Sequence, residues 1–402
     1  MPITSVVSDK ERRDNRKKII TTFFHNPSSS IPELAKQLDI SIPTVTKLVN
    51  ELVERGVLIE YGKSDSKTGR KPNTYGLNPQ SGYFLGIDIK RNHLNMALCN
   101  FNGEIVNQEF TVPFAEEKSP SEKLDDICDL IKAFIAATGI EKSKILNACV
   151  NMSGRVNPAT GFCHSSFNLS ELPLSELLSE KIGISVCIEN DTRAMTYGEM
   201  LRGVAVGEKN ILYVNMGWGL GLGMIINGQI YEGKSGFSGE FGHINAFDNE
   251  ILCHCGKKGC LETEVSGRAL YEEIIARIKE GKVSVLSQKV KNNELISMRD
   301  IVDAINDEDF LCIDLLEEIG KKLGRQLANL ITLFNPGLVV IGGVLSDTGD
   351  YLIHPVRQAV KKHSLKLVNN DTNIVCSKLH EKGGVIGACM TARRNMFERA
   401  KP

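Results

Sequence analysis

The first 60 residues carry apolar positions at helical spacing, separated by clear breaks. This spacing predicts helices over residues 15–25, 31–38 and 41–55, with a turn at 39–40 between the last two. Ser41 is expected to cap the third helix, because a serine hydroxyl can accept a hydrogen bond from a free amide in the first turn. A short helix, a tight turn and a longer helix together predict a helix-turn-helix.

Two short apolar segments follow, at residues 57–61 and 74–77, and the polar loop between them is basic. They predict a β-hairpin wing whose tip residues, Arg70 and Lys71, contact phosphate or enter the minor groove of DNA. The third helix carries small donors and acceptors and one cation that can reach base edges in the major groove. These candidate DNA-binding residues are Ser41, Thr44, Thr46, Lys47 and Asn50. The alternative is a helical bundle used only for dimerisation, but the basic wing and the hydroxyl-rich helix favour DNA.

From residue 81 the pattern changes to an alternation of buried strands and amphipathic helices, which is typical of α/β folds. The first lobe is expected to hold an apolar strand that starts near residue 81 and ends in Asp88, further strands at 94–99, 104–110, 145–151 and 184–188, and a helix at about 120–138. A second lobe opens with a strand at 210–214, a glycine-rich turn and a hairpin that turns at Asn227-Gly228. A long helix at about 311–334 and a buried strand at 338–341 follow.

A chain of 402 residues is too long for one hydrophobic core, so several domains are expected. We predict a winged helix-turn-helix head at 1–80 and a first α/β lobe at 81–195, joined by a C-terminal helix at 384–400. A second α/β lobe is predicted at 196–383. The head holds 13 Lys and Arg against 9 Asp and Glu, and the remainder holds 35 against 40. A basic head on an acidic body is consistent with a polyanionic partner for the head.

The sequence shows no apolar run long enough to span a membrane and no secretory signal. Eleven cysteines, an odd number, argue against a disulfide framework and for a reducing compartment, so a cytoplasmic location is expected.

Four residues of types that can bind a metal lie close together in the sequence: His243, Cys253, Cys255 and Cys260. Three thiolates and one imidazole form a closed tetrahedral set, which predicts a structural zinc ion and disfavours iron. The alternative is ordinary buried thiols, but these cysteines lie among glycines and lysines. His254 alternates with two of the ligands and is expected to point away.

Several motifs follow one another along the body: Asp88 after a strand, Asn190-Asp191, the glycine-rich 217–223 turn, Glu240-x-x-His243 with the cysteine cluster, and Gly342-Gly343. Their order resembles that of the ROK family (repressors, open reading frames and sugar kinases). The resemblance implies an actin-like (ribonuclease H-like) two-lobed ATPase fold with a sugar in the cleft. It also implies cytoplasmic homodimers or homotetramers.

The resemblance also implies a sugar pocket. Asn190 would bind sugar hydroxyls and Asp191 would occupy the position of the catalytic base. The other implied sugar ligands are Gly154, Asn168, Glu240, His243 and Glu262. For each residue a plainer role is open: an Asn-Asp pair after a strand is often a helix cap, and Glu262 could be a surface carboxylate.

The phosphate-binding segments depart from the kinase pattern of the family. Lys90, Arg91 and Asn92 stand where the kinases have a Gly-Gly-Thr-like loop, and Trp218 stands between two glycines where they have threonine. Two departures in one subsite predict that phosphoryl transfer is lost and that the chain is not an enzyme. The alternative is that Lys90 and Arg91 themselves neutralise phosphate.

These observations predict a sugar-responsive transcriptional regulator, most simply a repressor of carbohydrate-utilisation genes. A homodimer would bind a double-stranded operator with an inverted repeat, and a monosaccharide effector would bind in the kinase-like body. The second hypothesis is an ATP-dependent kinase of a hexose or N-acetylhexosamine that has kept a DNA-binding head. A third is a protein that acts only by docking other proteins.

Overall fold

The computed structural model describes residues 10–24, 26–63, 72–115, 117–165, 167 and 171–398. The chain divides into two compact units. Unit 1 is Met1–Met152, Gly161–Glu189 and Ala388–Pro402, and unit 2 is Ser153–Thr160 and Asn190–Gly387. The head is therefore grouped with the first α/β sheet, and the predicted division into three domains stays a prediction.

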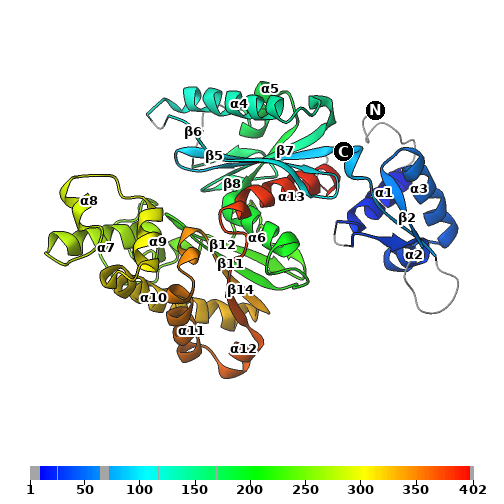
Figure 1. The fold of residues 1–402 in the computed structure, drawn as a ribbon. Helices are drawn as coiled ribbons and strands as arrows, with labels where there is room; N and C mark the ends of the chain where they lie inside the picture. The colour runs from blue at the N-terminus through cyan, green and yellow to red at the C-terminus, as the bar shows by residue number, and fades with distance from the viewer. Residues whose placement is uncertain are drawn as a thin grey trace. The chain divides into compact units, whose positions relative to one another are not determined.

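The head is a winged helix-turn-helix, as predicted (Figure 1). Its helices are α1 (Lys10–Thr22), α2 (Ile31–Leu38) and α3 (Ile42–Glu54). The wing strands β2 (Leu58–Lys63) and β3 (Asn73–Leu77) pair antiparallel, and β1 (Ser29–Ser30) pairs with β3. The first helix begins and ends earlier than the predicted 15–25, because the apolar pattern marks only the buried face and the polar residues before it are also helical.

Local chemistry fixes the three-helix geometry. Ser30 and Glu33 form a reciprocal capping box at the start of α2. Asp39 adopts a left-handed conformation (φ 53°) that ends α2 and turns the chain. The Ser41 hydroxyl then accepts a hydrogen bond from the Thr44 amide and begins α3, as the sequence predicted.

Unit 1 also contains a five-stranded sheet with the order β10-β7-β4-β5-β6. β4 is antiparallel to β5 and parallel to β7. The strands are β4 (Tyr83–Ile89), β5 (His93–Asn100), β6 (Ile105–Pro113), β7 (Ile145–Met152) and β10 (Val186–Asn190). The short strands β8 (Val156–Asn157) and β9 (Phe162–Cys163) lie in the segment between β7 and α5.

Helices cover both faces of this sheet (Figure 1). α4 (Pro120–Ala137) and α5 (Leu174–Ile182) lie on one face, and α13 (Lys382–Glu398) lies on the other. Asn147 of β7 donates a hydrogen bond to the Ala392 carbonyl at 2.9 Å, which ties α13 to the sheet. The α13 residues from Ala388 on belong to unit 1.

An aromatic cluster joins the end of the head's first helix to α13 within unit 1. The ring of Phe24 lies 5.5 Å from that of Phe397, which lies 5.9 Å from Phe101. The Arg393 guanidinium, only 1% exposed, sits 4.1 Å from the Phe24 ring centroid. A buried cation on an aromatic face is a favourable contact, which accounts for the grouping of the head with the sheet.

Unit 2 is built on a second five-stranded sheet with the order β13-β12-β11-β14-β15. β11 is antiparallel to β12 and parallel to β14. The strands are β11 (Ile211–Met216), β12 (Leu220–Ile226), β13 (Gln229–Ile230), β14 (Leu338–Gly342) and β15 (Asn373–Cys376). The predicted hairpin turn at Asn227-Gly228 is present, and both residues have positive φ.

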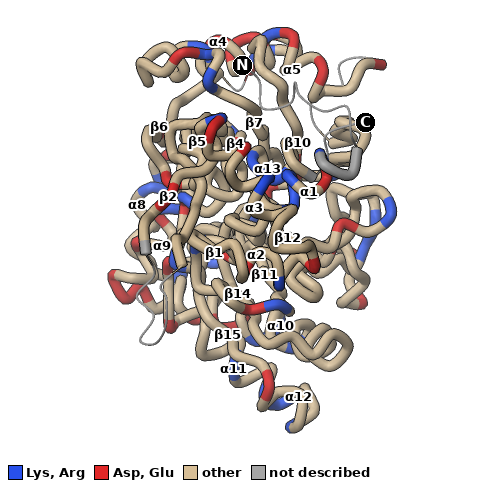
Figure 2. Tube along the Cα trace, turned by 90° about the vertical axis from the view of Figure 1, so that its right-hand side faces the viewer, with Lys and Arg blue, Asp and Glu red and all other residues tan. Residues whose placement is uncertain are grey.

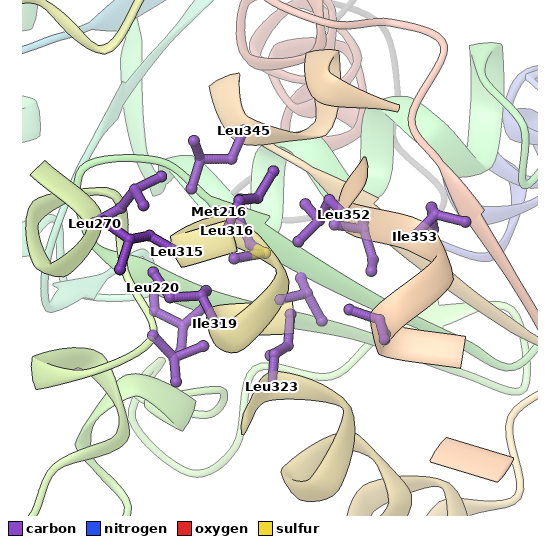
Figure 3. Close-up of a cluster of buried hydrophobic side chains, with 14 of the residues drawn as sticks. Met216, Leu220, Leu270, Leu315, Leu316, Ile319, Leu323, Leu345, Leu352 and Ile353 are labelled. Atoms are coloured by element: carbon purple, nitrogen blue, oxygen red, sulfur yellow. The ribbon is translucent and has the colours of Figure 1, made fainter. Parts of the chain in front are cut away.

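The helices of unit 2 enclose one large apolar core. Leu315, Leu316, Ile319 and Leu323 of α10 point into it together with side chains from the sheet and from neighbouring helices (Figure 3). The helices are α6 (Asp191–Arg202), α7 (Gly267–Lys279), α8 (Ser287–Lys291), α9 (Met298–Asn306), α10 (Phe310–Phe334), α11 (Asp350–His363) and α12 (Lys366–Asp371). This core packs beneath the strands of the sheet, including β12.

Charged residues of both signs are interspersed along the chain (Figure 2). Within the described ranges, no helix has both the length and the apolar character required to cross a membrane.

Candidate functional site

The four predicted metal ligands come together in one loop of unit 2. His243 ends the short 3-10 turn η3 (Phe241–His243), and Cys260 immediately precedes another, η4 (Leu261–Thr263). Between them a tight reversal carries Cys253 and Cys255, closed by a hydrogen bond from the Cys253 amide to the Lys257 carbonyl at 2.8 Å. All four ligand atoms lie within 4.8 Å of one another.

The separations between these atoms suit a tetrahedral ion. The Sγ atoms of Cys255 and Cys260 are 3.6 Å apart, and Cys253 Sγ lies 3.6 Å from His243 Nδ1. Zinc–sulfur and zinc–nitrogen bond lengths in a tetrahedron place such ligand pairs about 3.6–3.8 Å apart. Burial raises the pKa of the Cys260 thiol to about 12, so metal binding would have to displace a proton from it. The donor set therefore fits a closed structural metal site.

His254 does not point away, which corrects the expectation from the sequence. Its Nδ1 atom lies 3.1 Å from Glu262 Oε1 and 3.8 Å from Cys253 Sγ, and its ring packs edge-on against His243. The tight reversal of the loop turns the His254 ring back over the cluster, so simple alternation along an extended strand does not apply.

Glu262 is held by the start of β12. Its Oε2 atom accepts a hydrogen bond from the Leu220 amide at 2.9 Å, and its side chain is 9% exposed. A Cβ atom on Gly219 would lie 2.9 Å from Glu262 Oε2, and one on Gly242 would lie 2.6 Å from the Leu220 carbonyl oxygen and 3.2 Å from Glu262 Cβ. The carboxylate is therefore fixed in position, and it is not the free surface group that the plainer reading allowed.

Asp191 and Asn190 lie at the N-terminus of α6. The Asn190 side chain caps the helix by accepting from the Arg193 amide at 3.1 Å, and it donates to the Gly154 carbonyl at 3.0 Å. The cap role that the sequence left open is therefore real for Asn190. Asp191 is 9% exposed and accepts from the Ser153 hydroxyl at 2.7 Å and from the Thr192 amide at 2.7 Å.

Glu240 follows a glycine that only the tertiary structure explains. Gly239 has φ 85°, and a Cβ atom there would lie 1.9 Å from the Leu222 carbonyl oxygen. This close approach lets the Leu222 amide donate to the Gly239 carbonyl at 3.2 Å. The Glu240 carboxylate then lies 3.8 Å from His243 Nε2, whereas Cys253 Sγ lies next to the other ring nitrogen, Nδ1.

Three successive residues of β12 thus organise the candidate ligands. The Leu220 amide donates a hydrogen bond to Glu262, and the Leu222 amide donates one to the Gly239 carbonyl, next to Glu240. Between them, Gly221 packs against Thr192, the neighbour of Asp191. Small-molecule sites usually carry a few polar groups in fixed positions, and each of these candidate ligands is attached to this strand directly or through a neighbouring residue. Asn168, predicted as a further sugar ligand, lies outside the described residues.

In the predicted phosphate segment of unit 1, a lysine forms an ion pair with a buried aspartate. Asp88 is fully buried near the end of β4, and Lys90 Nζ lies 2.9 Å from its Oδ2 atom. In unit 2, Trp218 stands in the turn between β11 and β12, 41% exposed, with its ring 5.7 Å from that of Tyr271. The occupation of a nucleotide site by Trp218 stays a prediction.

The predicted DNA-binding residues of α3 share one exposed side of the head. Ser41, Thr44, Lys47 and Asn50 are exposed, and Thr46 is half-buried. Glu51, on the same helix, forms an ion pair with Arg16 of α1. Arg70 and Lys71 of the wing lie outside the described residues.

Comparison with known families agrees with this architecture. Residues 84–395 match the model of the ROK family, and residues 12–59 match a winged helix-turn-helix DNA-binding model. The chain belongs to the ROK family. The family match covers both α/β sheets and the metal loop, and the resemblance seen in the sequence is confirmed.

Members of the ROK family that resemble this chain include regulators and kinases. The xylose repressor of Caldicellulosiruptor bescii is 29% identical, over 93% of this chain and 94% of its own length. The crystal structure of a ROK transcriptional regulator, a homologue of E. coli Mlc, superposes with a TM-score of 0.81 at 27% identity, over 97% of both chains. A Streptomyces griseus ROK glucokinase in complex with glucose and AMPPNP gives 0.67 at 27%, over 78% of this chain and 100% of that one.

Sequence reasoning missed three partners within these sites. Ser153 binds Asp191, His254 binds Glu262, and Arg16 binds Glu51. Each pair joins residues that are not neighbours in the sequence, and only for His254 did the sequence hold a signal, namely its place between two cysteines.

Proposed function

We propose that this ROK protein is a sugar-responsive transcriptional repressor. The observation that carries the proposal is a DNA-binding winged head on the same chain as a rigid carboxylate and imidazole cluster suited to a polyol. The full-length likeness to regulators supports the combination, since the glucokinase relative matches only 78% of the chain.

The effector is a monosaccharide that binds at the cluster organised by β12. Glu240 and His243 offer an exposed edge, and Asp191 and Glu262 offer buried, oriented carboxylates. A site of this kind discriminates strongly against ligands that lack the matching hydroxyl groups, because its buried acceptors would be left without partners. Gly154 and Asn168 complete the proposed sugar-binding set.

The metal is zinc, held by His243 and the three cysteines in a structural role. When bound, zinc supplies a rigid cross-link and no reactive position, because all four sites of the tetrahedron are filled. His243 presents Nδ1 to the cluster and Nε2 to Glu240. One imidazole thereby ties the metal loop to the sugar-binding edge.

Phosphoryl transfer is lost in this chain. The Lys90 ammonium sits on the buried Asp88 carboxylate, a pairing that leaves no charge at that carboxylate for a nucleotide-bound cation to balance. A long cation in a loop that needs close backbone approach to phosphate further disfavours ATP.

The kinase hypothesis makes a different prediction. It is favoured by Asp191, which is buried and oriented by Ser153 as a base for a sugar hydroxyl would be. ADP release is measured with a panel of hexoses and N-acetylhexosamines, for the full chain and for Asp191→Asn. Turnover that disappears in Asp191→Asn would replace the repressor proposal with the kinase.

The operator is an inverted repeat bound by a homodimer or by a homotetramer. A two-fold assembly presents two α3 helices to successive major grooves about one helical turn apart. The test is selection of DNA from a random library by the full chain, followed by titration with sugars at fixed DNA. Enrichment of an inverted repeat that one sugar releases supports the proposal, and a failure to enrich any sequence contradicts it.

A further inference from the structure

Ile42 is an exposed aliphatic side chain at the point where α3 is expected to meet DNA. It is 54% exposed and lies with Pro43 and Thr46 along a shallow hollow on the outer side of the helix. Single exposed aliphatic residues are ordinary on protein surfaces. The chemistry of the neighbouring groups decides whether this one has a role.

The hydroxyl groups beside Ile42 are largely engaged within the head. Ser41 Oγ and Thr44 Oγ1 lie 2.8 Å apart and share one hydrogen bond. The Thr46 hydroxyl donates to the Ile42 carbonyl at 2.8 Å. Of the three hydroxyl protons, two are therefore used inside the protein. Ile42 and Pro43, two of the three residues that line the N-terminal end of the hollow, have purely hydrocarbon side chains.

Charges along α3 indicate which end of the hollow approaches DNA. Lys47 and Asn50 lie in the middle of it, and Glu51 and Glu54 lie at the far end. Arg16 binds Glu51, but Glu54 is exposed. Because the phosphate backbone repels an exposed carboxylate, we expect the N-terminal half of α3, with Ile42, to enter the groove.

We propose that the Ile42 edge of α3 reads the 5-methyl group of a thymine in each operator half-site. Thymine alone among the four bases presents a methyl group in the major groove, and apolar side chains are its usual partners. Asn50, two helical turns further on, can pair with an adenine edge, so both groups favour A·T pairs. The proposal rests on the DNA-binding function proposed above and names what that helix recognises.

The test uses the operator selected by the full chain, with each thymine replaced in turn by deoxyuridine, which removes only the methyl group. Binding is measured by fluorescence anisotropy. At the contacted thymine we expect about fourfold weaker binding per half-site, the value for one buried carbon. In Ile42→Ala the same replacement should no longer change the affinity, because the apolar partner is gone.

Ile42→Ala should fold, because alanine is a better helix former than isoleucine. Val53→Ala is the matched control: Val53 is a half-buried aliphatic residue of the same helix that does not line the hollow. Val53→Ala should keep the full effect of deoxyuridine.

Two results would overturn the proposal while leaving DNA binding intact: an operator whose affinity no deoxyuridine replacement changes, or a deoxyuridine effect that is the same in Ile42→Ala as in the parent chain. If no sequence is enriched at all, the DNA-binding function fails and this inference falls with it.

Discussion

Removing the proposed zinc from the cysteine loop should lower the unfolding temperature of unit 2. A metal held by the four residues would join His243 to Cys260 and close a loop of about 17 residues, and a cross-link of that size constrains the unfolded chain by about 3 kcal/mol. For a unit of about 200 residues, this corresponds to a fall of about 6–12 °C in the unfolding temperature. Calorimetry of the full chain before and after chelation measures the shift.

The same perturbation is made genetically with Cys255→Ser. We expect about one zinc per chain in the parent protein by elemental analysis, a reduced content in Cys255→Ser, and a matching loss of stability. Because His243 touches both the metal cluster and Glu240, Cys255→Ser should also weaken effector binding. Cys128→Ala is the control, since Cys128 is a buried thiol of α4 far along the sequence from the loop.

The metal hypothesis is refuted if the purified chain holds no metal and chelation leaves its unfolding temperature unchanged. A Cys255→Ser variant that loses zinc but keeps normal sugar affinity and normal release from DNA would refute the link between metal and effector.

Three further perturbations test separate parts of the molecule. Gly239→Ala should abolish the sugar response while DNA binding persists, because the new Cβ would collide with the Leu222 carbonyl. Gly207→Ala is the control and should keep the response, because Gly207 has a similar φ but open space around it. An unchanged sugar titration in Gly239→Ala would contradict the role given to β12. Lys47→Ala should weaken binding to all DNA sequences and reduce the salt slope of the affinity by about one ion, measured by anisotropy at several salt concentrations. A loss of affinity confined to one sequence would instead make Lys47 a base-reading residue. Hydrogen bonds from the Ser30 amide and hydroxyl lower the pKa of Glu33, so the contribution of Glu33 to stability is complete above pH 4.5 and is lost as the pH falls through the lowered value. Glu33→Gln should therefore flatten the acid side of the profile of unfolding free energy against pH, measured by chemical denaturation. An identical profile in both proteins would contradict the capping box.

The sequence by itself determined the elements and the chemical groups. The helical spacing of apolar residues and the cap at Ser41 predicted the helix-turn-helix, because both signals are local. The closely spaced cysteines with His243 predicted a metal loop, because few other structures use that donor set among glycines. The order of the motifs predicted the ROK family.

The tertiary structure decided how these groups are held and which of them are free to act. Ser153 meets Asp191, Leu220 meets Glu262, and Arg16 meets Glu51 only after strands and helices far apart in the sequence have packed. The same packing turned His254 toward Glu262. Side-chain direction depends on backbone reversal and on neighbours supplied by other segments, and no periodicity along a single segment records either of them.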